Sequence, residues 1–194
     1  KVLLEFRERF WETQNGIYGG GSVTDLPNRF MYYPSERMDS VKGGVMLVSY
    51  SWADDARKWD SMSPYERYTC ALNNVAITHA VHAPDASYEE REIAQQKIKD
   101  LCVFNAEKYL DQQDNIVGAA TVSWMHNPYA FGEAAIFYPG QLDLLHKSII
   151  KSEWPAHSTS RGILHFAGEH ASLKHAWIEG SIESAVNAAL LVNE

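Results

Sequence analysis

The last thirty or so residues join a short apolar run to an amphipathic helix through a glycine and a polar loop. The run "GILHFAG" (162–168) has the composition of a buried strand and stops at Gly168. We expect the helix to begin near Ala176, and its apolar residues fall on one stripe: Ile178, Ile182, Ala185, Val186, Ala189 and Leu190. Because the first N–H groups of a helix lack intrahelical acceptors, a strand tip facing this end suits a pyrophosphate or the polar edge of a ring.

Strand patterns dominate the first half of the chain. Val2, Leu4 and Phe6 alternate with other residues from the very start, and "RFMYYPS" (29–35) is a second strand candidate. The run "GGVMLVSYSW" (43–52) is continuously apolar, as in a strand covered on both faces, and it places Tyr50 and Trp52 on one side. A shorter strand is expected within "NIVGAATVSWM" (115–125).

Two capping boxes mark helix starts. Ser63 and Glu66 flank Pro64 at the first helical position, and this helix should run to about His82. Ser87 and Glu90 repeat the pattern and predict a strongly polar surface helix. A short helix is also expected in "PGQLDLLHKSII" (139–150). Strands and helices together predict an α+β (mixed) fold.

Composition narrows the range of partners. The 194 residues carry a formal net charge of −8 and no basic stripe, which argues against nucleic acid. No apolar run reaches the roughly 18 residues of a membrane span. Cys70 and Cys102 match no metal or redox spacing and are interpreted as reduced, mostly buried thiols. A chain that begins without Met and inside a strand is expected to be a piece of something longer.

Several site types have little support. The glycines at 19–21 lead into a Pro-containing stretch instead of a helix, so we interpret residues 14–30 as a turn-rich connection. His165, His170 and His175 recur every five residues and share no helical face, which argues against a metal site. His79 and His82 are interpreted as ordinary surface histidines, and the GxSxG motif of hydrolases is absent.

Local chemistry leaves two interpretations of the C-terminal stretch open. In the first, Glu169 binds a sugar-like hydroxyl beside the free N–H groups of the helix start. In the second, Glu169 merely caps, Trp177 lies in the core and Gly168 makes a turn.

Residues outside this stretch add a family resemblance. "FAGEHASLKHAWIEGSIESAVNAA" (166–189) resembles the C-terminal FAD-binding segment of the flavin amine oxidases, within them the L-amino-acid oxidases, and most of all the bacterial L-glutamate oxidase type. The segments 43–62 and 124–141 also look like successive blocks of that family. The resemblance implies a C-terminal fragment of a two-domain FAD-binding fold: a substrate-domain mixed sheet with helices, plus the last strand and helix of the FAD-binding domain.

The same resemblance implies domain boundaries. Residues 1–10 would form a strand at the domain boundary, residues 11–150 part of the substrate domain, and residues 151–194 the FAD-binding segment. Residues 84–113 look longer than the matching family region and are expected to be a surface insertion. The family's GxGxxG motif and its carboxylate-binding arginine are not found in this sequence.

Roles for single residues also follow from the resemblance. Glu169, next to Gly168, would bond the ribityl chain of FAD, and Tyr50 would hold the substrate carboxylate. The Ala176 carbonyl would face the substrate amino group. The walls of the pocket around the substrate side chain would be Trp52, Ala134 and Trp177. The backbone that lies against the flavin and the pyrophosphate would be Trp177, Ile178, Glu179, Gly180 and Ser181.

The implied reaction is oxidative deamination of an L-amino acid with FAD and O₂, which gives a 2-oxo acid, ammonia and hydrogen peroxide. Alternatives are an amine or polyamine oxidase, an amino-acid monooxygenase, or a non-catalytic scaffold subunit. The chain is expected to be one product of proteolytic processing, bound to the N-terminal chain of the same precursor in a homodimer or larger assembly. Nucleic acid and membrane are not expected partners, and a secreted location is favoured over a cytoplasmic one.

Overall fold

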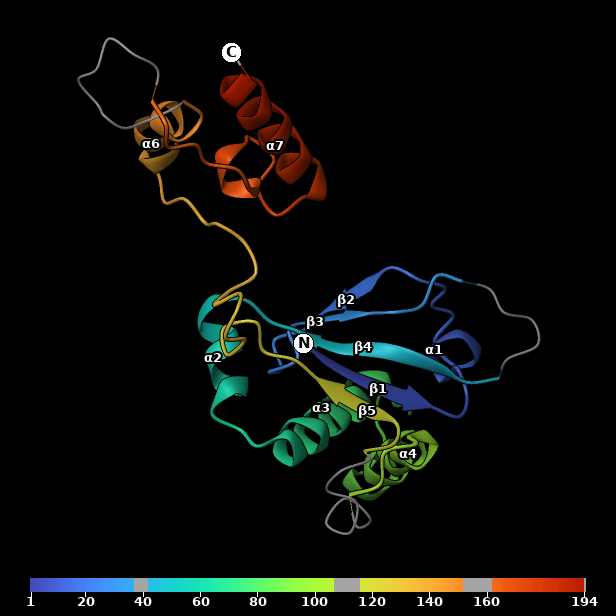
Figure 1. Ribbon diagram of the computed structural model, residues 1–194. Coiled ribbons are helices and arrows are strands. Elements are labelled where there is room, and N and C mark those ends of the chain that lie inside the picture. The colour runs from blue at the N-terminus through green and yellow to red at the C-terminus, as the bar shows by residue number, and fades with distance from the viewer. Residues whose placement is uncertain (37–41, 107–115, 152–161, 194) are drawn as a thin grey trace. The chain divides into compact units, whose positions relative to one another are not determined.

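The computed structural model describes residues 1–36, 42–106, 116–151 and 162–193. It forms two compact units, Lys1–Ser123 and Trp124–Glu194, and each is described by itself (Figure 1). The expected boundaries at residues 10 and 150 concern the domains of the family and stay predictions. Helices and strands are both present, as the sequence predicts.

The first unit is built on a five-stranded sheet of order β2-β3-β4-β1-β5. The strands are β1 (Val2–Phe6), β2 (Gly21–Val23), β3 (Phe30–Tyr32), β4 (Gly44–Tyr50) and β5 (Ala119–Thr121). Every pairing between these strands is antiparallel, so the expectation of a mixed sheet is wrong for the part of the chain that the structure describes. The physical reason is connection length: β2, β3 and β4 follow one another through loops too short for a parallel crossover with a helix. Residues 21–23 of the expected turn-rich connection at 14–30 form β2 instead.

One face of this sheet carries the core. Val2, Leu4 and Phe6 are buried, as their alternation predicts, and Met46 and Val48 of β4 lie among them. Helix α3 (Pro64–His79) contacts β1, β4 and β5, and it crosses the sheet in Figure 1. The expectation that β4 is covered on both faces is not met, because the Val45 side chain is 48 % exposed.

Both capping boxes are present. The Ser63 and Ser87 hydroxyls accept the N–H groups of Glu66 and Glu90, and these carboxylates accept the serine N–H groups in return. They open α3 and α4 (Tyr88–Leu101); α3 ends at His79, slightly before the expected position. Helices α1 (Phe10–Thr13) and α2 (Ala53–Asp60) complete this unit among the named elements.

The described part of the stretch 84–113 is more than a surface element; its residues 107–113 lie outside the described ranges. Helix α4 is largely exposed, as expected, but Ile98 is buried, and Cys102 and Phe104 join the core behind β1. The Val103 N–H donates to the Glu5 carbonyl, and this ties the stretch to β1. Burial raises the pKa of the Cys102 thiol to about 11. Both cysteines are free, as predicted, but only Cys102 is buried, and Cys70 is partly exposed.

His79 corrects a sequence interpretation, because it is buried in the core and not on the surface. Its Nδ1 lies 2.9 Å from the Val75 carbonyl and its Nε2 lies 2.7 Å from the Tyr33 hydroxyl. Ser22 Oγ lies 2.6 Å from the same hydroxyl. These contacts fit a neutral imidazole that donates from Nδ1 and accepts at Nε2. Helical position alone does not reveal this, since Tyr33 follows β3 and its own partner Ser22 lies in β2.

We expect His79 to make the fold sensitive to acid. Burial lowers the pKa of His79 below its usual 6.5, so the unfolded chain binds a proton first as the pH falls. Stability is therefore retained above about pH 6.5 and lost below it, by up to about 1.4 kcal/mol per pH unit. Denaturant unfolding at pH 5 to 8 measures this slope. The slope should flatten in His79→Gln and persist in the exposed control His82→Gln; equal slopes in both variants would contradict the assignment.

The second unit contains α6 (Gln141–Ile149), the 3₁₀ helix η1 (Glu169–Ala171) and α7 (Ile178–Asn193). Helices α6 and α7 were predicted. Of the strand expected at 162–168 only an isolated β-bridge at Leu164 is formed, and the neighbouring Ile163 is 78 % exposed. A strand needs a neighbour for its backbone groups, and the described residues of this unit include no named strand that could pair with it.

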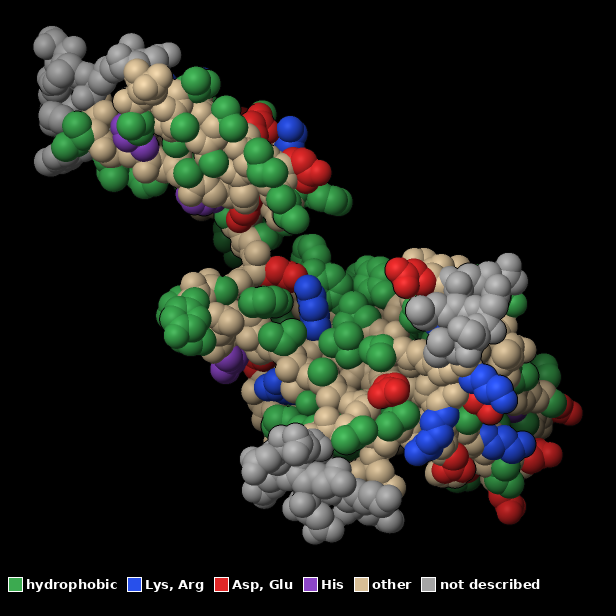
Figure 2. Space-filling model, turned by 45° about the vertical axis from the view of Figure 1, so that its right-hand side comes forward, with side chains coloured by type: hydrophobic (Ala, Val, Ile, Leu, Met, Phe, Trp, Pro, Cys, Tyr) green, Lys and Arg blue, Asp and Glu red, His purple; other side chains and the backbone are tan. Residues whose placement is uncertain are grey.

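Helix α7 turns its small residues toward η1. Gly180 and Ser184 are buried there. The predicted apolar stripe lies on the exposed side, with Ile178, Ile182 and Val186 all more than half exposed. Figure 2 shows many hydrophobic side chains at the surface of both units. No helix within the described ranges is long and apolar enough to cross a membrane.

Candidate functional site

Glu169 lies at the centre of the second unit's predicted site. Its Oε1 accepts the Ala135 N–H at 2.6 Å and its Oε2 accepts the Ala176 N–H at 3.0 Å. Gly168, just before it, has a φ of 144°, which a residue with a side chain rarely adopts. Both observations agree with the simpler interpretation, in which Glu169 caps and Gly168 makes a turn. Since a carboxylate has about four lone-pair sites, room remains for a further donor, and the predicted bond to a ribityl hydroxyl stays a prediction.

The backbone at Ala176 is strained. Its φ of 65° lies in the left-handed region, which costs a residue with a Cβ about 1–2 kcal/mol. Next to it, the His175 ring stacks on Phe137 with centroids 4.6 Å apart and planes inclined by 23°. Trp177, which follows, is 68 % exposed, so the interpretation of Trp177 as a core residue is wrong.

The start of α7 is packed closely against the loop before it. A Cβ at Gly180 would overlap the Lys174 carbonyl and Ser172 Oγ, so only glycine fits there. Ser184 Oγ accepts the Gly168 N–H at 2.9 Å and donates to the Ser181 carbonyl at 2.9 Å. Glycine and serine thus hold the helix start beside Glu169 and Ala176.

An aromatic group marks the other predicted position, in the first unit. The Tyr50 and Trp52 rings meet edge to face with centroids 5.6 Å apart, which confirms that they share a side. Tyr32 of β3 joins them, 6.1 Å from Tyr50, and was missed by the sequence analysis. The Lys1 ammonium lies 4.7 Å from the centre of the Tyr50 ring. The antiparallel pairing of β3 with β4 brings Tyr32 close to Tyr50. Interpreting the two strand candidates at 29–35 and 43–52 as an antiparallel pair would have predicted this contact.

A buried polar group supports the end of β4. Asn28 is fully buried; its Nδ2 donates to the Ala71 carbonyl, and its Oδ1 accepts from Asn74 Nδ2 at 2.9 Å. The Asn28 carbonyl accepts from Ser49 Oγ at 3.2 Å, one residue before Tyr50. These contacts tie the loop before β3, the end of β4 and α3 together.

The predicted residues fall into two sets, one on each unit. Tyr50 and Trp52 lie together on the first unit. On the second unit, the Glu169 carboxylate accepts the N–H groups of both Ala135 and Ala176. The backbone next to Ala134 therefore lies beside the backbone that leads to Trp177.

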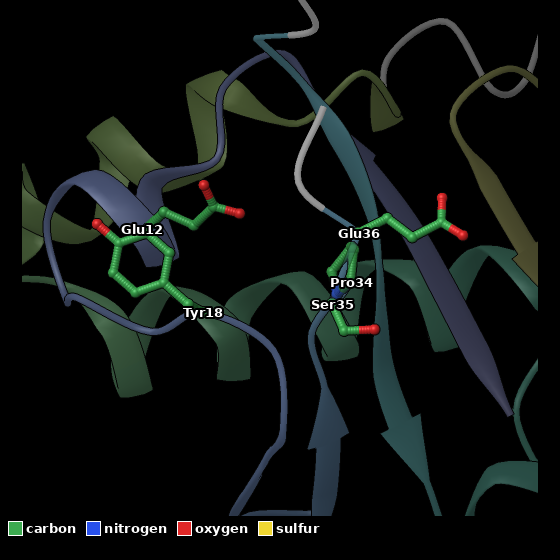
Figure 3. Close-up of a pocket in the computed structure, with 5 residues that line it drawn as sticks. All are labelled: Glu12, Tyr18, Pro34, Ser35 and Glu36. Atoms are coloured by element: carbon green, nitrogen blue, oxygen red, sulfur yellow. The ribbon is translucent and has the colours of Figure 1, made fainter. Parts of the chain in front are cut away.

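A separate surface pocket of about 280 Å³ contains none of these residues (Figure 3). It is lined by Glu12, Tyr18, Pro34, Ser35 and Glu36. Glu12 pairs with Arg9 at 3.0 Å, which partly neutralises the pocket's charge. Its two carboxylates and two hydroxyls do not resemble the aromatic and small-residue walls predicted for the substrate pocket.

Comparison with known proteins places these features in context. Residues 1–193 match the family described as flavin containing amine oxidoreductase. An L-glutamate oxidase precursor of Streptomyces diastatochromogenes is 44 % identical over 166 residues, which cover 86 % of this chain and 20 % of that protein. The putative L-amino-acid oxidase YobN of Bacillus subtilis is 37 % identical over 194 residues, covering 100 % of this chain and 32 % of that protein.

A third relative gives the same picture. The L-amino-acid oxidase of Siganus canaliculatus is 33 % identical over 195 residues, covering 100 % of this chain and 30 % of that protein. The chain thus spans between about a fifth and a third of the length of these curated relatives.

Proposed function

Because this chain belongs to the flavin-containing amine oxidoreductase family, we propose that it is part of an FAD-dependent enzyme that oxidatively deaminates an L-amino acid. The observation that carries the proposal is the aromatic group of Tyr32, Tyr50 and Trp52, in a chain similar to L-glutamate and L-amino-acid oxidases. The products are a 2-oxo acid, ammonia and hydrogen peroxide.

The residues of the second unit fit a flavin nucleotide. Helix α7 begins at Ile178, and the first N–H groups of a helix have no intrahelical acceptors. The Gly180 N–H donates to the Trp177 carbonyl, so the N–H groups of Ile178 and Glu179 are the ones that suit phosphate or pyrimidine oxygens. Trp177 and Ile178 at this end are exposed and apolar, as a surface that meets a ring would be. We therefore assign Gly168, Glu169 and the backbone of residues 177–181 to FAD. When bound, the flavin supplies the acceptor for a hydride equivalent from the substrate Cα.

The chain's own residues bind and orient the amino acid. The Tyr50 hydroxyl donates to the substrate carboxylate, and the nearby Lys1 ammonium favours that negative charge. The family resemblance assigns Trp52 of the first unit, and Ala134 and Trp177 of the second unit, to contacts with the substrate side chain. The Ala176 carbonyl accepts from the substrate amino group, and these contacts together fix the direction of the Cα–H bond.

Tyr50→Phe tests the proposal. The variant keeps the ring contacts and removes only the hydroxyl, so we expect KM for the preferred amino acid to rise about tenfold, as for one lost charge-assisted hydrogen bond. The flavin spectrum should not change. Steady-state peroxide and ammonia assays across a panel of amino acids and amines, with product mass, measure the effect.

The matched control is Tyr88→Phe, whose exposed ring lies at the start of α4 away from these residues. An unchanged KM in Tyr50→Phe would contradict the role of Tyr50. Turnover of amines alone would instead favour an amine or polyamine oxidase, an amide product would favour a monooxygenase, and no turnover at all would favour a non-catalytic subunit.

A further inference from the structure

Two segments far apart in the sequence meet on the Glu169 side chain. One carboxylate oxygen accepts the Ala135 N–H and the other accepts the Ala176 N–H. The stacked rings of Phe137 and His175 bring the same two segments together beside these bonds. We name the carboxylate with its two N–H donors the Glu169 bridge.

The bridge requires the chemistry of a glutamate. Two backbone N–H groups point at one side chain, and only an ionised carboxylate can accept at both of its ends. Glutamine offers a single acceptor oxygen and would place its amide hydrogens against the second N–H. Aspartate has the same carboxylate on a side chain one methylene shorter, so it cannot reach both donors without moving the backbone.

One end of the bridge holds a strained residue. Ala176 has a φ of 65°, and the N–H of this residue is the one that Oε2 accepts. The left-handed conformation decides where the Ala176 carbonyl and the Trp177 side chain point. The other end holds Ala135, directly after Ala134.

We propose that Glu169 is a positioning residue of the substrate pocket, acting through the backbone at Ala135 and Ala176. The inference rests on the proposed function, which puts Ala134, Ala176 and Trp177 against the amino acid. It adds a role to the bond with flavin implied by the family resemblance: Glu169 fixes the spacing of two walls that meet the substrate.

Glu169→Gln, in the flavin-loaded protein that contains this chain, tests the bridge. Hydrogen exchange followed by mass spectrometry reads the Ala135 and Ala176 amides directly, and at least one should exchange about tenfold faster. KM for the amino acid should rise about tenfold while kcat changes by less than about threefold, because substrate and transition state lose the same contacts. Because Glu169 is also assigned to FAD, flavin content is measured for each variant, and KM and kcat are taken for the flavin-loaded fraction.

Glu183→Gln is the matched control, since Glu183 lies on the surface of α7 and pairs only with the exposed Lys174 among the contacts described. It should leave exchange and KM unchanged. Unchanged exchange in Glu169→Gln would overturn the bridge. A loss of activity that follows the loss of flavin, with normal KM in the loaded fraction, would overturn the positioning role and leave flavin binding alone.

Glu169→Gln with Ala176→Gly keeps the test decisive if the single variant folds poorly. Glycine adopts a positive φ without strain, so the double variant removes the need to hold Ala176 while the Ala135 amide is still released. Fast exchange at Ala135 supports the bridge, and slow exchange there overturns it. Wild-type protein that binds flavin but oxidises no amino acid would overturn the proposed function and the substrate part of this inference. Faster exchange of the Ala135 and Ala176 amides in Glu169→Gln would still support the bridge in that case.

Discussion

Replacing Gly180 by alanine is expected to remove most of the bound flavin and to lower the free energy of unfolding by about 2 kcal/mol. In an ordinary helix this substitution stabilises by up to about 1 kcal/mol. Here the added Cβ would overlap the Lys174 carbonyl and Ser172 Oγ, so the loop before α7 must move. Overpacking of this kind costs about 1–3 kcal/mol, which outweighs the gain in helix propensity.

The displacement matters for function because the loop leads directly to Ala176 and Trp177. We expect flavin affinity to fall by about tenfold or more, as for the loss of one or two backbone contacts to the cofactor. Flavin absorbance per protein and fluorescence titration with FAD measure this. Glu183→Ala, on the exposed side of the same helix, is the control and should change stability by less than about 1 kcal/mol. A variant with wild-type flavin affinity would show that the helix start does not meet the cofactor.

Local signals in the sequence were sufficient for α3, α4, α6 and α7, whereas the shorter helices α1 and α2 were not predicted. Each capping box involves residues three positions apart, so Ser63 with Glu66 and Ser87 with Glu90 specify a helix start without tertiary partners. The alternation of Val2, Leu4 and Phe6 likewise predicts a strand with one buried face. These patterns describe an element and its neighbours in the sequence, which is why they were read correctly.

Features that depend on distant partners were not predicted. His79 can be buried because the Tyr33 hydroxyl, from another part of the chain, forms a hydrogen bond with its Nε2 inside the core. The run 162–168 has strand composition, but a strand forms only beside another strand. The composition of a segment shows whether it can be buried. Which other segment packs against it is decided by the arrangement of elements in the fold.

The candidate site divides in the same way. Motif resemblance identified Glu169, Ala176 and Trp177, because the segment 166–189 is continuous in sequence. It could not show that Ala135 shares the Glu169 carboxylate, since 34 residues separate them. It also missed Tyr32, whose contact with Tyr50 follows from strand pairing.

Asn28→Ala is expected to lower the free energy of unfolding by about 3 kcal/mol, because a fully buried amide leaves both a cavity and an unpaired partner. Asn74 Nδ2 loses its 2.9 Å acceptor, and Asn74 is itself buried. Denaturant unfolding followed by fluorescence measures the change. Asn73→Ala, one residue away on the exposed face of α3, is the matched control and should stay within about 0.5 kcal/mol of the wild type.

A double-mutant cycle separates the Asn28–Asn74 bond from the cavity. If the two amides stabilise each other, Asn28→Ala with Asn74→Ala should cost about 1–2 kcal/mol less than the two single changes added together. Additive effects would mean that the bond contributes little and that lost packing accounts for the destabilisation. Asn28→Ala keeps the main-chain carbonyl that accepts from Ser49 Oγ, but the loop that carries this carbonyl loses its side-chain bonds to α3. The resulting shift of the loop should loosen the end of β4, where Ser49 precedes Tyr50. We therefore expect KM for the amino acid to rise in Asn28→Ala even at temperatures where the protein remains folded, and a normal KM would show that Tyr50 is held by its ring contacts alone.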